Sequence, residues 1–129
     1  MKILLLDANW YQTSYLVAEL HSVGADVVLA SPMPPDPKGI GQWCRQIPSP
    51  SADDPAYGDF LFPLLAGESF DLVLPLCEPI QQVLWNTPAS SAAPIFPDTT
   101  PLQRDVLADR RRLYELAGTI GVPVPRMES

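Results

Sequence analysis

Three consecutive arginines, Arg110 to Arg112, follow Asp109 in a chain whose formal net charge is −7. A guanidinium group stays charged at any working pH and presents a planar fork of donors that matches phosphate oxygens. Cations at the start of a helix oppose its macrodipole, which argues against a purely structural role. The alternative is a solvated helix start in which Asp105 and Asp109 offset the positive charge. Both interpretations stay open on these residues alone.

Two further polar residues follow apolar runs, at points where a buried strand would end. Glu78 lies between the run at 70–77 and a predicted helix, so its carboxylate is a candidate to receive a substrate ammonium or to be held by backbone donors. Asn9 also lies between an apolar run and a predicted helix, where capping is favoured over a ligand contact. We take Glu78 and Asn9 as candidate substrate-binding residues.

The other reactive side chains are two cysteines, Cys44 and Cys77, and one histidine, His21. They form neither a disulfide framework nor a recognisable zinc spacing. Cys77 has no basic neighbour in the sequence and is interpreted as a small buried hydrophobe. His21 stands late in a predicted helix and is interpreted as a solvated or dipole-facing side chain. We therefore expect no catalytic residue and no metal ligand in this sequence.

Apolar runs alternate with amphipathic stretches along the chain. Runs without polar alternation, typical of strands buried on both faces of a parallel sheet, occur at 3–6, 25–31 and 70–78, and a short fourth strand is predicted at 93–98. Amphipathic or capped stretches predict helices at 13–22, 59–66, 79–85, 101–107 and 110–120. This alternation predicts an α/β domain with a mostly parallel sheet of about four strands.

The sixteen prolines avoid residues 1–31 and crowd into 32–63. Proline lacks a backbone donor and moves its predecessor away from helix, so residues 32–55 should be mostly loop. A loop of that length in a small domain is usually functional or mobile. The aromatic residues Trp10, Tyr11 and Trp43 fit the wall of a pocket, and packing in the core or in a lid explains them equally well.

Composition excludes several classes of partner. A pI near 4.4 leaves no basic face for nucleic acid. No stretch approaches the ~20 apolar residues of a membrane span, and the apolar run at the start is shorter than the roughly 7–15 residues of a signal peptide core. At 129 residues, we expect one cytoplasmic domain without nucleic-acid or membrane partners. A homodimer is among the states that the sequence allows.

The end of the chain resembles the ATP-grasp superfamily of ligases. Residues 109–112 read Asp-Arg-Arg-Arg and are followed by Leu-x-x-Leu-Ala at 113–117 and Gly-Val-Pro-Val-Pro at 121–125. This order is similar to the junction at which a pre-ATP-grasp domain passes into the nucleotide-binding lobes. The Asp-Arg-Arg-Arg version resembles that of the large subunit of carbamoyl-phosphate synthetase. The segment "DLVLPLCEPIQQVL", 71–84, is similar to the family's pattern of strand, proline and glutamate, then helix.

The resemblance implies a Rossmann-like, three-layer domain over 1–121, with 122–129 beginning the linker to ATP-grasp lobes that lie outside this sequence. It implies that Arg110 contacts ATP phosphates, although most members carry lysine there. The intact enzyme would use ATP and Mg²⁺ to activate a small carboxylate for capture by an amine or thiol. This domain would help to bind the carboxylate or amine substrate, would hold no cofactor alone, and would be inactive in isolation.

Other α/β functions fit the residues less well. A nicotinamide-binding Rossmann domain needs glycines after its first strand, and "DANWYQTS" at 7–14 has none. A phosphoacceptor receiver domain needs an aspartate where Cys77 stands and a later lysine, but no lysine follows Lys38. A stand-alone α/β binding module, or the N-terminal half of a two-domain glycosyltransferase, stays open as the alternative.

Overall fold

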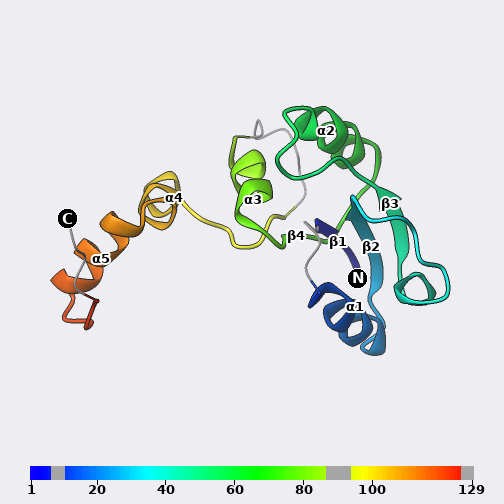
Figure 1. The fold of residues 1–129 in the computed structure, drawn as a ribbon, viewed down its shortest axis with the longest axis horizontal. Helices are drawn as coiled ribbons and strands as arrows, with labels where there is room; N and C mark the ends of the chain where they lie inside the picture. The colour runs from blue at the N-terminus through cyan, green and yellow to red at the C-terminus, as the bar shows by residue number, and fades with distance from the viewer. Residues whose placement is uncertain (7–10, 87–93, 126–129) are drawn as a thin grey trace. The chain divides into compact units, whose positions relative to one another are not determined.

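The computed structural model describes residues 1–6, 11–86 and 94–125 (Figure 1). In chain order its elements are β1 (Lys2–Leu6), α1 (Thr13–Ser22), β2 (Asp26–Ser31), the short 3-10 helix η1 (Ile40–Gln42), β3 (Arg45–Pro48), α2 (Tyr57–Gly67), β4 (Leu72–Pro75), α3 (Glu78–Trp85), α4 (Pro101–Ala108) and α5 (Arg110–Thr119). They fall into two compact units, Met1–Pro97 and Asp98–Ser129, which are described separately. The domain boundary expected at 121/122 stays a prediction.

The first unit is built on a four-stranded sheet in the order β3-β2-β1-β4. Every pair of neighbours is parallel: Leu4 of β1 lies opposite Val28 of β2 and Val73 of β4, and Val28 lies opposite Arg45 of β3. The predicted α/β class with a mostly parallel sheet of about four strands is confirmed. Because the strands are parallel, their carboxyl ends share one edge of the sheet, where ligands bind in open α/β folds.

The fourth strand is not the one that the sequence predicts. Residues 93–98 were expected to form it, but within the described part Ile95 makes only an isolated bridge to Val73. Pro94 precedes Ile95 and Pro97 follows it two residues later. Because proline has no backbone N–H to donate, these two residues limit further pairing of the segment with β4. The fourth strand is instead Arg45–Pro48, inside the expected loop, and it pairs along the outer edge of β2.

Side chains of the central strands alternate between two layers of helix. Leu4 and Leu6 face one core cluster, which includes residues of α2 and α3, whereas Ile3 and Leu5 face the other, with Val17 of α1. The three leucines at positions 4 to 6 are completely buried. The helices thus cover both faces of the sheet, and the interpretation of uninterrupted apolar runs as strands buried on both faces is confirmed (Figure 1).

Local signals place the helices of the first unit close to their predicted positions. Helix α1 spans Thr13–Ser22, and Gly24 follows it with a φ of 81°, a conformation that glycine adopts without strain. Helix α3 begins at Glu78 with proline in its first turn. Helix α2 is longer than expected and contains Pro63. None of the described helices is both long enough and apolar enough to cross a membrane.

The second unit contains helices α4 and α5, each with a side-chain cap at its start. Thr100 and Gln103 form a reciprocal capping box on α4, with hydrogen bonds of 3.3 and 2.8 Å. Asp109 Oδ1 accepts hydrogen bonds from the backbone N–H groups of Arg111, at 2.9 Å, and Arg112, at 3.3 Å. Thr100 and Asp109 thus cap the two helices that the sequence predicts at 101–107 and 110–120.

Candidate functional site

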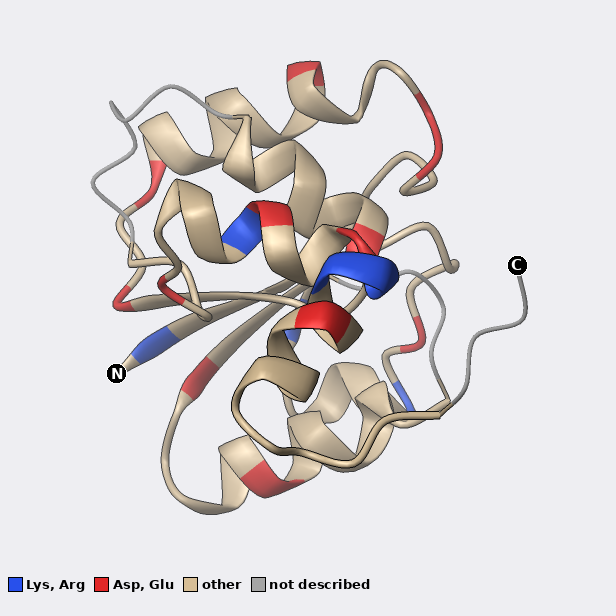
Figure 2. Cartoon of the chain, turned by 90° about the vertical axis from the view of Figure 1, so that its left-hand side faces the viewer, with Lys and Arg blue, Asp and Glu red and all other residues tan. Residues whose placement is uncertain are grey.

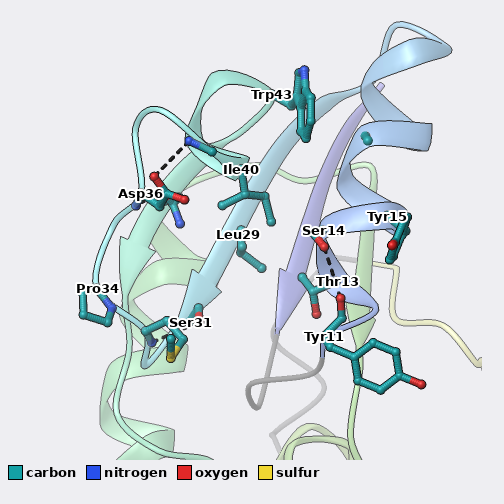
Figure 3. Close-up of a pocket in the computed structure, with 14 residues that line it drawn as sticks. Tyr11, Thr13, Ser14, Tyr15, Leu29, Ser31, Pro34, Asp36, Ile40 and Trp43 are labelled. Carbon is teal, nitrogen blue, oxygen red and sulfur yellow. Dashed lines mark hydrogen bonds between the residues drawn. The ribbon is translucent and has the colours of Figure 1, made fainter.

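A cavity of about 700 Å³ lies at the carboxyl end of β2, between α1 and the segment that leads from β2 into β3 (Figure 3). Its size is within the range of small-molecule sites in proteins. The described residues that line this β2 cavity come from both sides of it: Tyr11, Thr13, Ser14, Tyr15, Ala18, Leu29, Ser31, Met33, Pro34, Asp36, Gly39, Ile40, Trp43 and Gln46.

The inner surface of the β2 cavity is apolar. Leu29 belongs to the buried core, and Ile40 and Trp43 pack partly against the same cluster. Figure 3 shows Leu29 and Ile40 between the loop and α1. On the helix side, Tyr11 and Tyr15 are 76% and 73% exposed, so their rings are available to a ligand. Of the aromatic residues for which a pocket wall and packing were both open, Tyr11 and Trp43 line this cavity, and Trp43 also packs against the core.

Thr13 is the buried polar residue of this cavity. It is the first residue of α1 and is only 4% exposed, yet its Oγ1 has no hydrogen-bond partner among the described residues. Gln12 precedes it without a side-chain cap, and the first turn of α1 contains no acidic residue. A buried hydroxyl without a partner costs about 1–3 kcal/mol. A ligand that bonds to this hydroxyl would recover that cost.

Hydrogen bonds from Asp36 hold the loop wall of the cavity. Its backbone N–H donates to Gln46 Oε1 at 2.7 Å, its Oδ1 accepts from Gly39 N–H at 2.9 Å, and its carbonyl accepts from Gly41 N–H at 2.8 Å. A side chain at either glycine would collide with Asp36. A Cβ on Gly41 would lie 2.6 Å from the Asp36 carbonyl oxygen, and one on Gly39 would lie 2.0 Å from Asp36 Oδ2. This wall is therefore ordered without help from a ligand.

The two serines of the cavity are also engaged in local structure. Ser14 Oγ donates to the carbonyl of Tyr11 at 3.1 Å, and Ser31 Oγ accepts from the N–H of Met33 at 3.2 Å. Asp36 is the one charged side chain among the described lining residues, which include no lysine, arginine or histidine. The cavity thus combines an apolar surface, one unpartnered hydroxyl and one carboxylate.

Neither predicted substrate residue is among the described residues that line the β2 cavity. Asn9, with Asp7 and Trp10, lies outside the described residues. Glu78 is exposed at the start of α3, and its Oε1 accepts a long hydrogen bond of 3.4 Å from Gln82 Nε2. Glu78 is not among the residues that line the β2 cavity. Its role in substrate binding stays a prediction.

Figure 2 marks the lysine and arginine positions of the chain in blue and the aspartate and glutamate positions in red. The three arginines of α5 differ in their partners. Arg111 Nε lies 3.5 Å from Glu115 Oε1, and Arg112 Nε lies 3.6 Å from Asp109 Oδ2. Arg110 is exposed and makes no ion pair with any described residue. An anion can therefore bind the Arg110 guanidinium group without displacing an ion pair with a described residue.

The structure offers no activated cysteine at residue 44. Cys44 Sγ donates to the carbonyl of Ile40 at 3.4 Å, and burial raises the pKa of this thiol to about 11. Such a thiol is almost wholly protonated at neutral pH and is a poor nucleophile. Across residues 1–6, 11–86 and 94–125, no group of three or more histidine, cysteine, aspartate and glutamate side chains is arranged to hold a metal ion.

Sequence reasoning missed Thr13, Asp36 and Gln46 as parts of the site. Asp36 has a usable signal, because an aspartate between prolines and shortly before glycines is typical of a side-chain-stabilised turn. Thr13 has no such signal. Its lack of a partner depends on which segments pack around the start of α1, and those segments are distant in sequence.

No family model and no curated protein matches this sequence. Among solved structures, the N5-carboxyaminoimidazole ribonucleotide synthetase from Thermotoga maritima, an ATP-grasp enzyme, matches with a TM-score of 0.65 at 20% identity, covering 97% of this chain and 32% of that chain. A UDP-galactose 4-epimerase matches with a TM-score of 0.40 at 19% identity, covering 95% and 36%. The chain thus spans about a third of the synthetase, and the predicted resemblance to an ATP-grasp enzyme is confirmed for the fold.

Proposed function

We propose that this chain is the pre-ATP-grasp domain of an ATP-grasp ligase. The observation that carries the proposal is its likeness in fold to the ATP-grasp enzyme N5-carboxyaminoimidazole ribonucleotide synthetase, which extends over 97% of the chain. The motifs support it independently: Glu78 at the start of α3, shortly after β4, then Asp-Arg-Arg-Arg, then Gly-Val-Pro-Val-Pro, in the family's order.

The reaction of the intact enzyme follows from this assignment. The γ-phosphoryl group of ATP passes to a substrate carboxylate, giving an acyl phosphate and ADP. An amine or thiol then attacks the acyl carbon and displaces inorganic phosphate. ATP and Mg²⁺ are the cofactors that we propose for that enzyme. We assign no described residue of this chain to the metal, since none of them belongs to a suitable cluster.

Arg110 is the residue that we propose for ATP phosphate contact. Arg111 and Arg112 already face carboxylates, whereas Arg110 has no carboxylate partner among the described residues. A guanidinium group bonds two phosphate oxygens at once and cannot lose its charge at neutral pH. Arginine therefore serves in place of the lysine that most members of the family carry.

The β2 cavity is the proposed substrate site of the domain. It lies at the carboxyl end of β2, the edge of a parallel sheet at which ligands bind, and its walls are held by their own hydrogen bonds. The substrate class is a small carboxylate or amine. Glu78 and Asn9 stay proposals as further substrate contacts.

The proposal is tested on the chain produced together with the coding sequence that follows residue 129. Calorimetric titration with ATP and Mg²⁺ should show Arg110→Ala weakening ATP binding by about tenfold to a hundredfold, the loss expected for hydrogen bonds to a charged group. Arg112→Ala is the matched control and should change the affinity by less than about threefold, since its ion pair is a surface contact. Equal effects of the two changes would refute the assignment of Arg110.

The type of domain encoded after residue 129 separates the ligase from the alternative function. A following lobe that is rich in glycine, bears a lysine and contains paired Glu and Asn metal ligands supports the ligase. A second Rossmann domain supports the glycosyltransferase half instead. The 129-residue chain by itself should hydrolyse no ATP, and micromolar ATP affinity of that chain would count against the proposal.

A further inference from the structure

We infer that the β2 cavity binds an unphosphorylated small molecule with an apolar, preferably aromatic, body and a single carboxylate end, which Thr13 selects. The inference rests on the proposed function, because it names the substrate class of the same domain. It depends on three features of the cavity: its apolar surface, the unpartnered hydroxyl at the start of α1, and the charges of its lining.

The apolar body is indicated by the inner surface and the rim. Leu29, Ile40 and Trp43 form a largely apolar surface held in place by the core, on which the indole N–H of Trp43 is the one polar side-chain group. Tyr11 and Tyr15 stand exposed on the opposite side, on α1 and just before it. Aromatic rings that flank an apolar surface favour a flat apolar ligand, which gains contact with both.

The carboxylate end is indicated by Thr13 and by the helix that it begins. The Oγ1 of Thr13 is buried and has no partner among the described residues, so it has a proton to donate to a ligand acceptor. The start of α1 carries no side-chain cap from Gln12 and no acidic residue in its first turn. Helix N-termini attract anions, because their first N–H groups lack acceptors and the helix dipole is positive there.

The charges of the lining exclude a phosphate ester. Phosphate sites in proteins use arginine or lysine, or a dedicated backbone loop, to balance close to two negative charges. The described lining of the β2 cavity contains no cation, and its one charged group, Asp36, is itself negative. Gly39 N–H bonds only one oxygen of that carboxylate, Oδ1. These charges therefore disfavour a dianion more strongly than a singly charged carboxylate, for which Thr13 and the start of α1 supply the donors.

The test uses the 129-residue chain, labelled with ¹⁵N, and three probes of similar size: 3-phenylpropionate, 3-phenylpropanol and 2-phenylethyl phosphate. We expect 3-phenylpropionate to shift the amide signals of Thr13, Ser14 and Ile40 and the indole signal of Trp43. Its affinity should exceed that of the alcohol and of the phosphate by about tenfold, the discrimination expected for one hydrogen bond to a charged group.

Substitutions at Thr13 connect that preference to its hydroxyl. Thr13→Val keeps the side-chain shape and should lower the affinity for 3-phenylpropionate about tenfold, whereas Thr13→Ser keeps the hydroxyl and should retain the affinity within about threefold. Ser22→Ala, at the other end of α1, is the matched control and should leave binding unchanged. Unaltered binding by Thr13→Val would overturn the role of the hydroxyl.

The outcomes distinguish this inference from the function on which it rests. Tighter binding of 2-phenylethyl phosphate to the cavity would overturn the substrate class while leaving the dependence of ATP binding on Arg110 intact. Absence of shifts at the cavity residues with all three probes would overturn the inference in the same way. Binding of 3-phenylpropionate, with Arg110→Ala neutral toward ATP, would support the inference and refute the assignment of Arg110. Binding of 3-phenylpropionate to a chain that is followed by a second Rossmann domain would support the inference and defeat the ligase.

Discussion

The backbone N–H of Asp36 donates a 2.7 Å hydrogen bond to Oε1 of Gln46, and this contact ties the loop wall of the β2 cavity to strand β3. The two residues are ten positions apart in the sequence. A proline-containing loop connects β2 to Asp36. Asp36 in turn accepts hydrogen bonds from the N–H groups of Gly39 and Gly41. The Gln46 side chain on β3 therefore holds the whole turn through Asp36. These hydrogen bonds fix the loop as one wall of the β2 cavity.

Gln46→Leu should loosen that wall without unfolding the sheet. Loss of the acceptor leaves the Asp36 N–H unpaired, and a hydrogen bond worth about 1 kcal/mol corresponds to roughly fivefold faster opening. Hydrogen–deuterium exchange of the Asp36 and Gly41 amides measures the change. Gln42→Leu is the control, because the Gln42 side chain makes only a 3.4 Å contact with the Lys38 carbonyl. Equal exchange in both variants would show that Gln46 does not hold the loop.

Thr13→Val should stabilise the ligand-free chain. The substitution removes a buried hydroxyl that has no partner in the described structure and replaces it with a methyl group of similar shape. We expect the free energy of unfolding to rise by about 1 kcal/mol in urea titrations, the lower end of the cost of an unsatisfied buried group. Ser22→Ala in the same helix should stay within about 0.5 kcal/mol of the parent chain. A clear loss of stability in Thr13→Val would mean that the hydroxyl is a structural element.

Glu68 should make stability depend on pH through two ion pairs at the amino end of the sheet. Its Oε1 lies 2.6 Å from Lys2 Nζ and also bonds the guanidinium group of Arg45. Hydrogen bonds from Lys2 and then Arg45 lower the pKa of Glu68 below its ordinary value of 4.5. A lowered pKa means that the contribution to stability is present above pH 4.5 and is lost as the pH falls through the pKa of the folded state.

Glu68→Gln therefore has a defined pH signature. At pH 7 we expect the free energy of unfolding to fall by about 0.5–1 kcal/mol, a modest loss because these side chains are partly exposed and screened. The difference from the parent chain should shrink toward zero in acid. Glu19→Gln serves as the control, since Glu19 makes no ion pair with a described residue. A difference between Glu68→Gln and the parent chain that is independent of pH would refute the ion-pair explanation.

Cys44 should resist alkylation in the folded chain. Burial raises the pKa of its thiol from 9.0 to about 11, so its thiolate at pH 8 is roughly a hundredfold scarcer than that of an unfolded cysteine. Mass spectrometry of iodoacetamide labelling in a Cys77→Ser background measures the rate. Labelling in denaturing guanidinium chloride provides the reference. Equal rates in the two conditions would show that the thiol is not protected by burial.

Local sequence patterns predicted most of the elements. Apolar runs around Leu4, Val28 and Val73 predicted three strands because a strand buried on both faces requires apolar side chains at every position. Asp109, and either Thr99 or Thr100, indicated helix starts because a capping side chain bonds N–H groups two or three residues away, and the structure assigns the first of these caps to Thr100. Both signals act over a few residues and can be read along the chain.

The chain's sequence by itself determined the α/β class, the central strands and the caps, since each depends on neighbouring residues. Only the tertiary structure decided that Arg45–Pro48, and not the segment around Ile95, completes the sheet, because an edge strand is selected by which backbone groups of its neighbour stay unpaired. It also decided that the Thr13 hydroxyl is buried without a partner among the described residues, in a cavity that Leu29 and Ile40 also line. That environment is created by segments far apart in the sequence, whose contacts form only when α1 and the loop pack on the same edge of the sheet.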